Sequence, residues 1–237
     1  MNNSLKNFIF FNSSRHRLRQ ENMDFAASIP NGALVLDAGA GSQPYRDLLG
    51  HTKYESADFE AVDKNYVRST YICDLKDIPV EDERFDYILF NQVMEHLPEP
   101  GRVLRELNRV IKPGGKIIYT GPLFYEEHEI PYDFFRYTQF GLRKLFTEEG
   151  FEIDRLDWLE GYFGTSAYQL NRMALYLPVK PSNIARGIKG YILAPILLLV
   201  KVFGMIFSIF FHRLELELKY TQKGYPKNYV AILVKKK

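Results

Sequence analysis

A short apolar run that ends in an aspartate and leads into two closely spaced glycines constrains the fold of this chain more than any other stretch. Residues 34–36 read Leu-Val-Leu, Asp37 follows them, and Gly39 and Gly41 come soon after. A continuous apolar run of this length is typical of a central parallel strand that is covered on both faces. Glycines allow sharp backbone turns and let a ligand approach the main chain closely. The stretch therefore predicts a buried strand followed by a ligand-binding loop.

Strand and helix patterns alternate from this loop to about residue 120, and further strands follow. Between the fourth and fifth strands, Val103, Leu104 and Leu107 recur at helical spacing. This alternation predicts right-handed βαβ units, and hence an α/β fold with a doubly wound parallel sheet. The predicted strands lie at residues 33–36, 53–58, 71–75, 85–92, 116–120, 151–158 and 229–234.

The glycine loop departs from the dinucleotide-binding fingerprint. That fingerprint has a third glycine three residues after the second, and this chain has Pro44 there. Such a strand also does not usually carry an acid two residues before its first glycine, which is the place of Asp37. A fixed negative charge beside a glycine loop suits a ligand with a cationic amine and a flat, hydroxylated body. We therefore predict S-adenosylmethionine as the ligand rather than NAD.

Polar residues follow the next strands at positions that suit the rest of this ligand. Asp58 lies about twenty residues beyond Asp37, at the end of the second strand, where an acid can accept both ribose hydroxyls. Asp74 could accept from an adenine amino group, with the Leu75 backbone beside the ring, although Asp74 is equally typical of a turn. The end of the fourth strand, from Asn91 onward, is expected to line the pocket for the methionine part.

Five segments in order resemble motifs of the class I S-adenosylmethionine-dependent methyltransferases of the methyltransferase-11 type. They are residues 35–41, Asp58, residues 73–75, residues 85–88 running into 93–97, and residues 105–107 running into 112–115. The resemblance covers about residues 30–155. It implies a Rossmann-like sheet of seven strands with the last one antiparallel, an enzyme, and S-adenosyl-L-methionine as cofactor. The cofactor-binding residues that follow from these motifs are Asp37, Gly39, Gly41, Asp58, Asp74, Leu75 and Asn91.

The acceptor side is predicted in residues 121–137, which are dense in aromatic and ionisable side chains. A loop of this kind over the carboxyl edge of a sheet is typical of a substrate lid. If the acceptor is a hydroxyl, a base must take its proton. His128 is the first candidate for this base, and Glu129 and Asp133 are the alternatives. The predicted substrate-binding residues are Tyr132, Arg136 and Tyr137.

A structural interpretation of the same loop also stays open. Asp133 and Arg136 could form an ion pair that only pins the loop, with His128 as a hydrogen-bonding residue. His, Asp and Glu do not recur here at the spacing of a metal site, so we expect no metal. His128 and Glu129 near Asp133 nevertheless leave that possibility open.

The net charge and the number of cysteines indicate which binding partners and which cellular compartment are expected. The formal net charge is only +2, which gives no global basic field for nucleic acid. Cys73 is the single cysteine, so no disulfide can form within the chain and a reducing, cytoplasmic location is favoured. The apolar patch at residues 8–11 is too short to be interpreted as a secretory signal.

About seventy residues separate the last two predicted strands, and residues 190–211 among them are almost entirely apolar. Their length would allow a transmembrane helix. Three features oppose a simple span: Lys201 lies near the middle, Pro195 and Gly204 can bend the run, and the last strand must return to the same sheet. The alternatives are a hairpin at the membrane surface and a homodimer interface or helical cap.

The predicted organisation therefore has three parts. An N-terminal helical cap covers residues 1–30, with Leu18, Met23, Phe25 and Ile29 as its apolar face. The methyltransferase domain covers 31–160 plus 226–237, and the apolar helical insertion covers 161–225. The predicted function is methyl transfer to a small-molecule, glycan or lipid-linked acceptor, at a hydroxyl. The alternative is a non-catalytic module of the same fold that acts as a partner in an assembly.

Overall fold

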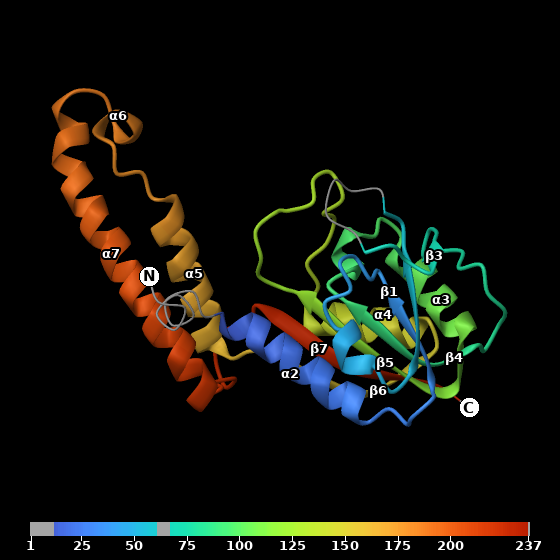
Figure 1. Ribbon diagram of the computed structural model, residues 1–237. Coiled ribbons are helices and arrows are strands. Elements are labelled where there is room, and N and C mark those ends of the chain that lie inside the picture. Colours follow the sequence, from blue (N-terminus) through green and yellow to red (C-terminus); the bar gives the residue numbers. More distant parts are fainter. Residues whose placement is uncertain (1–11, 61–66, 237) are drawn as a thin grey trace. The chain divides into compact units, whose positions relative to one another are not determined.

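The computed structural model describes residues 12–60 and 67–236, which form two compact units (Figure 1). One unit holds residues 17–159 and the strand from Asn228 onward, and the other holds residues 160–227 with residues 12–16. Residues 1–11, with the apolar patch at 8–11, lie outside the described part. The helix α2 (Ser13–Ala27) begins in one unit and continues in the other. The separate N-terminal cap over residues 1–30 stays a prediction.

The larger unit is built on one seven-stranded sheet in the order β3-β2-β1-β4-β5-β7-β6. All pairs from β3 to β5 are parallel, and β7 runs antiparallel to both β5 and β6. This confirms the predicted doubly wound sheet with an antiparallel last strand. The strands are β1 (Leu34–Ala38), β2 (Lys53–Asp58), β3 (Tyr71–Ile72), β4 (Phe85–Asn91), β5 (Ile111–Pro122), β6 (Phe151–Trp158) and β7 (Asn228–Lys235).

Alternate residues of the central strands point to two separate apolar layers, as the strand period requires. On one face Leu36 and Ile88 pack with the helices α3 (Pro100–Val110) and α4 (Gln139–Glu148). On the other face Val35 and Leu89 pack with Phe25 of α2. The sheet is therefore buried on both sides, which explains why its central strands read as continuous apolar runs.

Several predicted details differ from the structure. The fifth strand begins at Ile111 rather than at residue 116, with an irregular register before Tyr87 on its partner strand. The glycine loop is followed by a single 3-10 turn, η1 (Arg46–Leu49). Met23, predicted on the apolar face of the first helix, is 43% exposed. It lies two residues from the buried Phe25, which on a helix turns its side chain to the opposite side.

The smaller unit is a helical hairpin formed by α5 (Tyr162–Tyr176) and α7 (Ile188–Glu217), joined through the short α6 (Pro181–Ile184) (Figure 1). The two long helices run antiparallel and approach closely at Gly204, where an added Cβ would lie 3.0 Å from the Met173 side chain. The Ser208 hydroxyl donates to the carbonyl of Ala167 at 2.8 Å. The small residues of α7 therefore mark its contact with α5.

Charged side chains of α7 form hydrogen bonds with backbone groups at both ends of α5. The buried carboxylate of Glu215 accepts from the backbone N–H groups of Gly161 and Gly164, at 2.8 and 3.0 Å. Lys201 donates to the carbonyl of Leu175 at 3.2 Å, at the other end of the helix. Both charges complement the dipole of α5. Lys201, which argued against a membrane span, thus has a hydrogen-bond partner within the hairpin.

The packing of α4 gives a direct test of the fold, because the helix carries two phenylalanines in opposite environments. Phe146 is fully buried, and Phe140 is 74% exposed. We expect Phe146→Ala to lower the free energy of unfolding by about 3–5 kcal/mol through the lost burial and the cavity it leaves. Phe140→Ala, the matched control, should change it by less than about 0.5 kcal/mol. Urea denaturation measures both, and similar values for the two variants would contradict this packing.

Candidate functional site

A cavity of about 250 Å³ opens at the carboxyl ends of the parallel strands of the larger unit. Gly39, which follows β1, lies in its wall with a φ of +78°, and an added Cβ there would lie 2.3 Å from Val93. No larger residue fits this close approach. Gly41 has a φ of +52° and no heavy atom within 4 Å of the place of a Cβ. The loop therefore leaves open space beside its backbone, as a bound ligand requires.

Two predicted acids lie in the wall of this cavity. Asp58 ends β2, and its carboxylate oxygens accept from the N–H groups of Gly41 and Glu60, each at 2.9 Å. Asp74 accepts from the Lys76 N–H at 2.9 Å, and the buried Leu75 lies beside it in the cavity wall. A carboxylate oxygen has two lone pairs, so these contacts leave capacity for ribose hydroxyls and an amino group.

Asp37 and Asn91 have their polar atoms engaged inside the protein rather than in the cavity wall. The Asp37 carboxylate accepts from the Tyr54 hydroxyl at 2.7 Å, and burial raises the pKa of Asp37 to about 6. Asn91 exchanges hydrogen bonds with Asn22 of α2 and accepts from Thr120. Gln92, its neighbour, lines the cavity instead. The cofactor roles of Asp37 and Asn91 thus remain predictions.

The loop after β5 supplies another part of the cavity wall through Glu129, Tyr132 and Phe134. Its shape depends on Asp133, whose carboxylate receives two hydrogen bonds from Arg136 at 2.6 and 2.8 Å. The guanidinium holds the pKa of Asp133 low, at about 2. Asp133 also accepts from the His128 backbone N–H at 2.9 Å. The ion pair considered from the sequence is therefore present and fixes the loop.

Some predicted acceptor-side residues lie behind the cavity wall. His128, Asp133, Arg136 and Tyr137 are not among its lining residues in the described part of the chain. The Tyr137 hydroxyl is buried, and burial raises its pKa. The His128 ring packs edge-on against His96 and Tyr125, with centroids 4.6 and 4.9 Å apart. Among the predicted bases and substrate-binding residues, Glu129 and Tyr132 are the two that reach the cavity.

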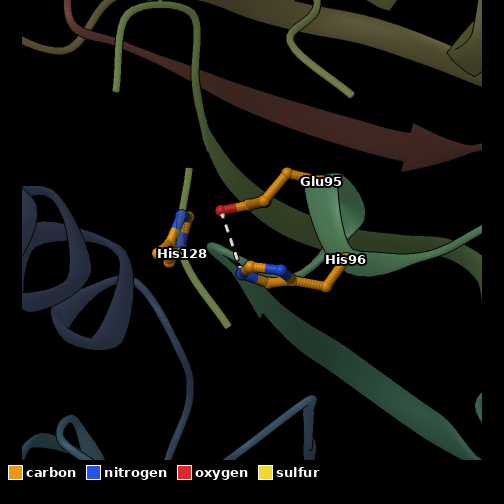
Figure 2. A group of neighbouring side chains, drawn as sticks. All are labelled: Glu95, His96 and His128. Atoms are coloured by element: carbon orange, nitrogen blue, oxygen red, sulfur yellow. Dashed lines mark ion pairs between the residues drawn. The ribbon is translucent and has the colours of Figure 1, made fainter. Parts of the chain in front are cut away.

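Sequence reasoning missed Glu95, which lies in the 3-10 turn η2 (Met94–His96) after β4. Its side chain is 1% exposed, and neither carboxyl oxygen has a hydrogen-bond partner among the described residues. Burial raises the pKa of Glu95 to about 8. Figure 2 shows it pointing toward the rings of His96 and His128. Its position next to His96 at a strand end was the available signal, but nothing in the sequence revealed its burial.

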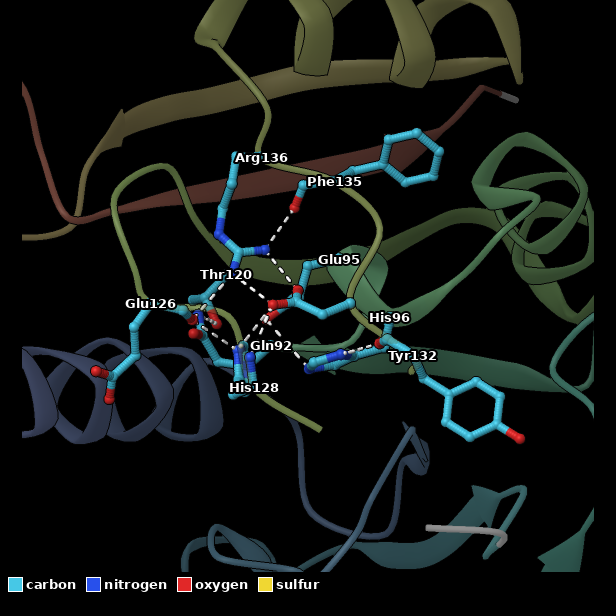
Figure 3. Close-up of polar contacts among 10 residues, drawn as sticks. Gln92, Glu95, His96, Thr120, Glu126, His128, Tyr132, Phe135 and Arg136 are labelled. Carbon is cyan, nitrogen blue, oxygen red and sulfur yellow. Dashed lines mark hydrogen bonds and ion pairs between the residues drawn. The ribbon is translucent and has the colours of Figure 1, made fainter. Parts of the chain in front are cut away.

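The surroundings of this cluster are strongly ordered by hydrogen bonds (Figure 3). His96 donates from Nδ1 to the carbonyl of Tyr132 at 2.5 Å, and its Nε2 lies 3.8 Å from a Glu95 oxygen. Burial lowers the pKa of His96, so the neutral ring is favoured. Because His96 also lines the cavity, the cluster borders the place where an acceptor would lie.

Residues 36–119, which supply the glycine loop, both cavity acids and η2, match the Methyltransf_11 family, described as a methyltransferase domain. The chain thus contains a methyltransferase domain of the class I S-adenosylmethionine-dependent type. This confirms the family, the fold and the cofactor predicted from the five motifs. The roles of single residues in this methyltransferase are not decided by the match.

The relatives of this methyltransferase are named for different methyl acceptors. A tRNA (carboxymethyluridine(34)-5-O)-methyltransferase of Xenopus tropicalis is 31% identical over 121 residues, 48% of this chain and 19% of that protein. A demethylmenaquinone methyltransferase of Staphylococcus saprophyticus is 26% identical over 176 residues, 66% of this chain and 72% of that protein. This chain thus spans about a fifth of the first relative and nearly three quarters of the second.

A solved structure shares the fold over most of the chain. It is phosphoethanolamine N-methyltransferase 2 of Haemonchus contortus in complex with S-adenosyl-L-methionine. The TM-score is 0.54 at 13% sequence identity, and the match covers 93% of this chain and 52% of that one. The acceptors of these proteins belong to different chemical classes, so the family alone does not identify the acceptor here.

The predicted contact between Asp58 and the ribose can be tested by substitution. We expect Asp58→Asn to weaken S-adenosylmethionine binding about 10- to 100-fold, because hydrogen bonds to a charged group contribute about 1.5–3 kcal/mol. Asp47→Asn is the matched control, because Asp47 is exposed and paired with Arg19 away from the cavity wall. Isothermal titration calorimetry measures the affinities. An Asp58→Asn affinity equal to that of the control would contradict the assignment.

Proposed function

We propose that this protein transfers the methyl group of S-adenosylmethionine to a hydroxyl of a small-molecule, glycan or lipid-linked acceptor. One observation carries the proposal. The cavity wall that holds Gly39, Asp58 and Asp74 also contains Glu129 and Tyr132 from the loop after β5. Donor-side and acceptor-side groups therefore share one space, as direct displacement requires.

The reaction itself is an in-line displacement at the sulfonium methyl carbon. The cofactor supplies the activated methyl group when bound, so the protein must mainly hold the acceptor oxygen in line with it. The hydroxyl proton must leave during attack. Glu129 is the best-supported base, because among the candidate bases it is the residue that lines the cavity. Asp133 is a poor base, because its pair with Arg136 keeps its pKa near 2. Tyr132 would orient the acceptor.

A lipid-linked acceptor is favoured by the exposed apolar surface of α7. This helix is long and apolar enough to cross a membrane by length and composition, and only 17% of its most apolar window is buried. Its outward residues include Leu199, Phe203 and Phe207. One relative is named for a quinone acceptor, demethylmenaquinone. The net charge of +2 gives no comparable support to nucleic acid.

We propose that the hairpin lies at a membrane surface without crossing it. Because α5 and α7 run antiparallel, the chain enters and leaves the hairpin at the same end. Basic residues flank the apolar run, with Arg186 and Lys189 before it and Arg213 and Lys219 after it. An apolar face bordered by basic side chains suits lipid tails and phosphates better than it suits a soluble protein partner.

The function is tested by methyl transfer from S-adenosylmethionine labelled in its methyl group. Purified protein is mixed with lipid and water-soluble fractions of cell extract, and label is followed into each. We expect transfer into the lipid fraction, at a rate that falls at least about tenfold in Asp58→Asn at low cofactor concentration. Cofactor binding without transfer into either fraction would instead support the non-catalytic alternative.

Membrane contact is tested by flotation with vesicles of phosphatidylethanolamine and phosphatidylglycerol. We expect the protein to float with them, and the triple change Leu199→Ser, Phe203→Ser and Phe207→Ser to reduce the bound fraction at least about tenfold. The control changes are Ile72→Ser and Phe140→Ser, which alter two exposed apolar residues of the other unit. A protein that stays unbound and forms a dimer, which the triple change dissociates, would point to a second subunit on this face.

A further inference from the structure

Three metal-ligating side chains from two distant segments converge beside the cavity. Glu95 and His96 come from the turn after β4, and His128 comes from the loop after β5. Their ligating atoms all lie within 4.8 Å of one another. Figure 2 shows the carboxyl group and the two rings facing a common centre. Nothing in the described methyl-donor site accounts for this grouping.

The buried carboxyl group of Glu95 is the first independent sign of a ligand. Both of its oxygens are buried, and neither has a hydrogen-bond partner among the described residues. A buried carboxyl group without a hydrogen bond is costly, and native proteins usually give such a group a hydrogen-bond partner, a water molecule or an ion. A cation between this group and the two imidazoles would provide the missing partner.

The hydrogen bonds of the two histidines are the second sign. His96 contacts the Tyr132 carbonyl through Nδ1, and His128 contacts the Glu126 carbonyl through Nδ1 at 3.2 Å. A carbonyl oxygen can only accept, so Nδ1 carries the proton in both rings and Nε2 keeps its lone pair. Protein ligands of metals are commonly oriented in this way by a carbonyl or a carboxylate on the other nitrogen.

A carboxylate completes this outer arrangement around His128. Its Nδ1 lies 3.3 Å from an oxygen of Asp133, and Asp133 is itself held by two hydrogen bonds from Arg136. The Asp133–Arg136 pair therefore fixes the histidine as well as the loop. This gives a reason for a partly buried ion pair placed behind the cavity wall rather than in it.

We propose that Glu95, His96 and His128 bind one divalent transition-metal ion, with Zn²⁺ as the representative case. Two imidazoles and one carboxylate are a common set for catalytic zinc and for non-haem iron, and they leave coordination positions open. Ligands about 2.1 Å from Zn²⁺ lie about 3.4 Å apart at a tetrahedral angle. Because the ligating atoms lie within 4.8 Å of one another, small side-chain adjustments would bring them to this spacing. Mg²⁺ is disfavoured, because it prefers oxygen ligands.

The chemical role of this ion rests on the proposed methyl transfer. An acceptor hydroxyl that reaches an open coordination position loses its proton more easily. That proton passes to the Glu129 carboxylate, and an electron pair of the oxygen forms the bond to the methyl carbon. The carbon–sulfur bond breaks, and its electrons leave with sulfur as the neutral thioether S-adenosylhomocysteine. Acceptors with two neighbouring oxygens would bind best, because both could reach the ion.

The test uses the full chain without a polyhistidine tag, after removal of metal with a chelator. Calorimetric titration with ZnCl₂ should show one Zn²⁺ per chain. We expect Glu95→Gln and His128→Asn each to weaken binding by more than about 100-fold, and Asp133→Asn by about 10- to 100-fold. His51→Asn is the matched control, because the His51 ring contacts the Ile29 carbonyl and does not belong to the cluster.

Thermal unfolding separates loss of the site from loss of the fold. Zn²⁺ should raise the Tm of the wild-type protein and of His51→Asn, but not that of Glu95→Gln, which keeps the shape of the buried side chain. Absence of stoichiometric Zn²⁺ binding would overturn the inference. Equal Zn²⁺ affinity in the wild-type, Glu95→Gln and His128→Asn proteins would also overturn it.

Different experimental outcomes would refute the metal site and the proposed function. Label transfer that is equal in metal-free protein, zinc-loaded protein and Glu95→Gln would leave the function intact and overturn the proposed role of the ion in the reaction. Zinc binding with the expected variant pattern, but without methyl transfer into any fraction, would support the metal site and refute the function. Affinity for S-adenosylmethionine, measured on the same metal-free sample, shows that the donor side is folded.

Discussion

The parallel pairing of β1 with β2 on one side and β4 on the other is the constraint on which the site depends. Leu36 is level with Glu55 on β2 and with Ile88 on β4. This register brings the ends of the three strands to one edge of the sheet. The glycine loop, Asp58 and the turn η2 therefore meet without long excursions of the chain. Contact between Gly39 and Val93 then joins the first of these segments to the last.

A second constraint shapes the loop after β5, where the chain has no regular secondary structure to hold it. The Asp133–Arg136 pair and its hydrogen bonds to the backbone near His128 hold this loop in place of the backbone hydrogen bonds that a helix or sheet would provide. A loop fixed in this way can present Glu129 and Tyr132 to the cavity at low cost in conformational entropy. It also holds His128 beside His96 and Glu95, which is the arrangement that the metal inference uses.

The helical hairpin differs from the sheet in which side chains it buries and which it exposes. Its internal contacts include small residues, a buried glutamate and a lysine, and many large apolar side chains of α7 are exposed. In water such a surface is unfavourable, because apolar area stays exposed. The cost disappears if lipid covers the helix. The same residues that make the insertion unusual for a soluble fold therefore support the proposal of a membrane surface.

The sequence by itself determined the sheet, the glycine loop and the cofactor. Strand and helix periods, Pro44 in place of a third glycine, and the spacing of Asp58 and Asp74 are local features that can be counted along the chain. The exact beginning of the fifth strand and the exposure of Met23 were predicted wrongly. Both depend on contacts with neighbouring elements rather than on local preference.

Tertiary structure alone decided which polar groups meet. The sequence contained Glu95 and His128 more than thirty residues apart, with no spacing that signals a shared ligand. Burial of Glu95 depends on packing around the end of β4, and the position of His128 depends on an ion pair in another part of its own loop. A sequence pattern gives the separation of two residues along the chain but not their distance in space. The folded topology therefore decides which of them come into contact.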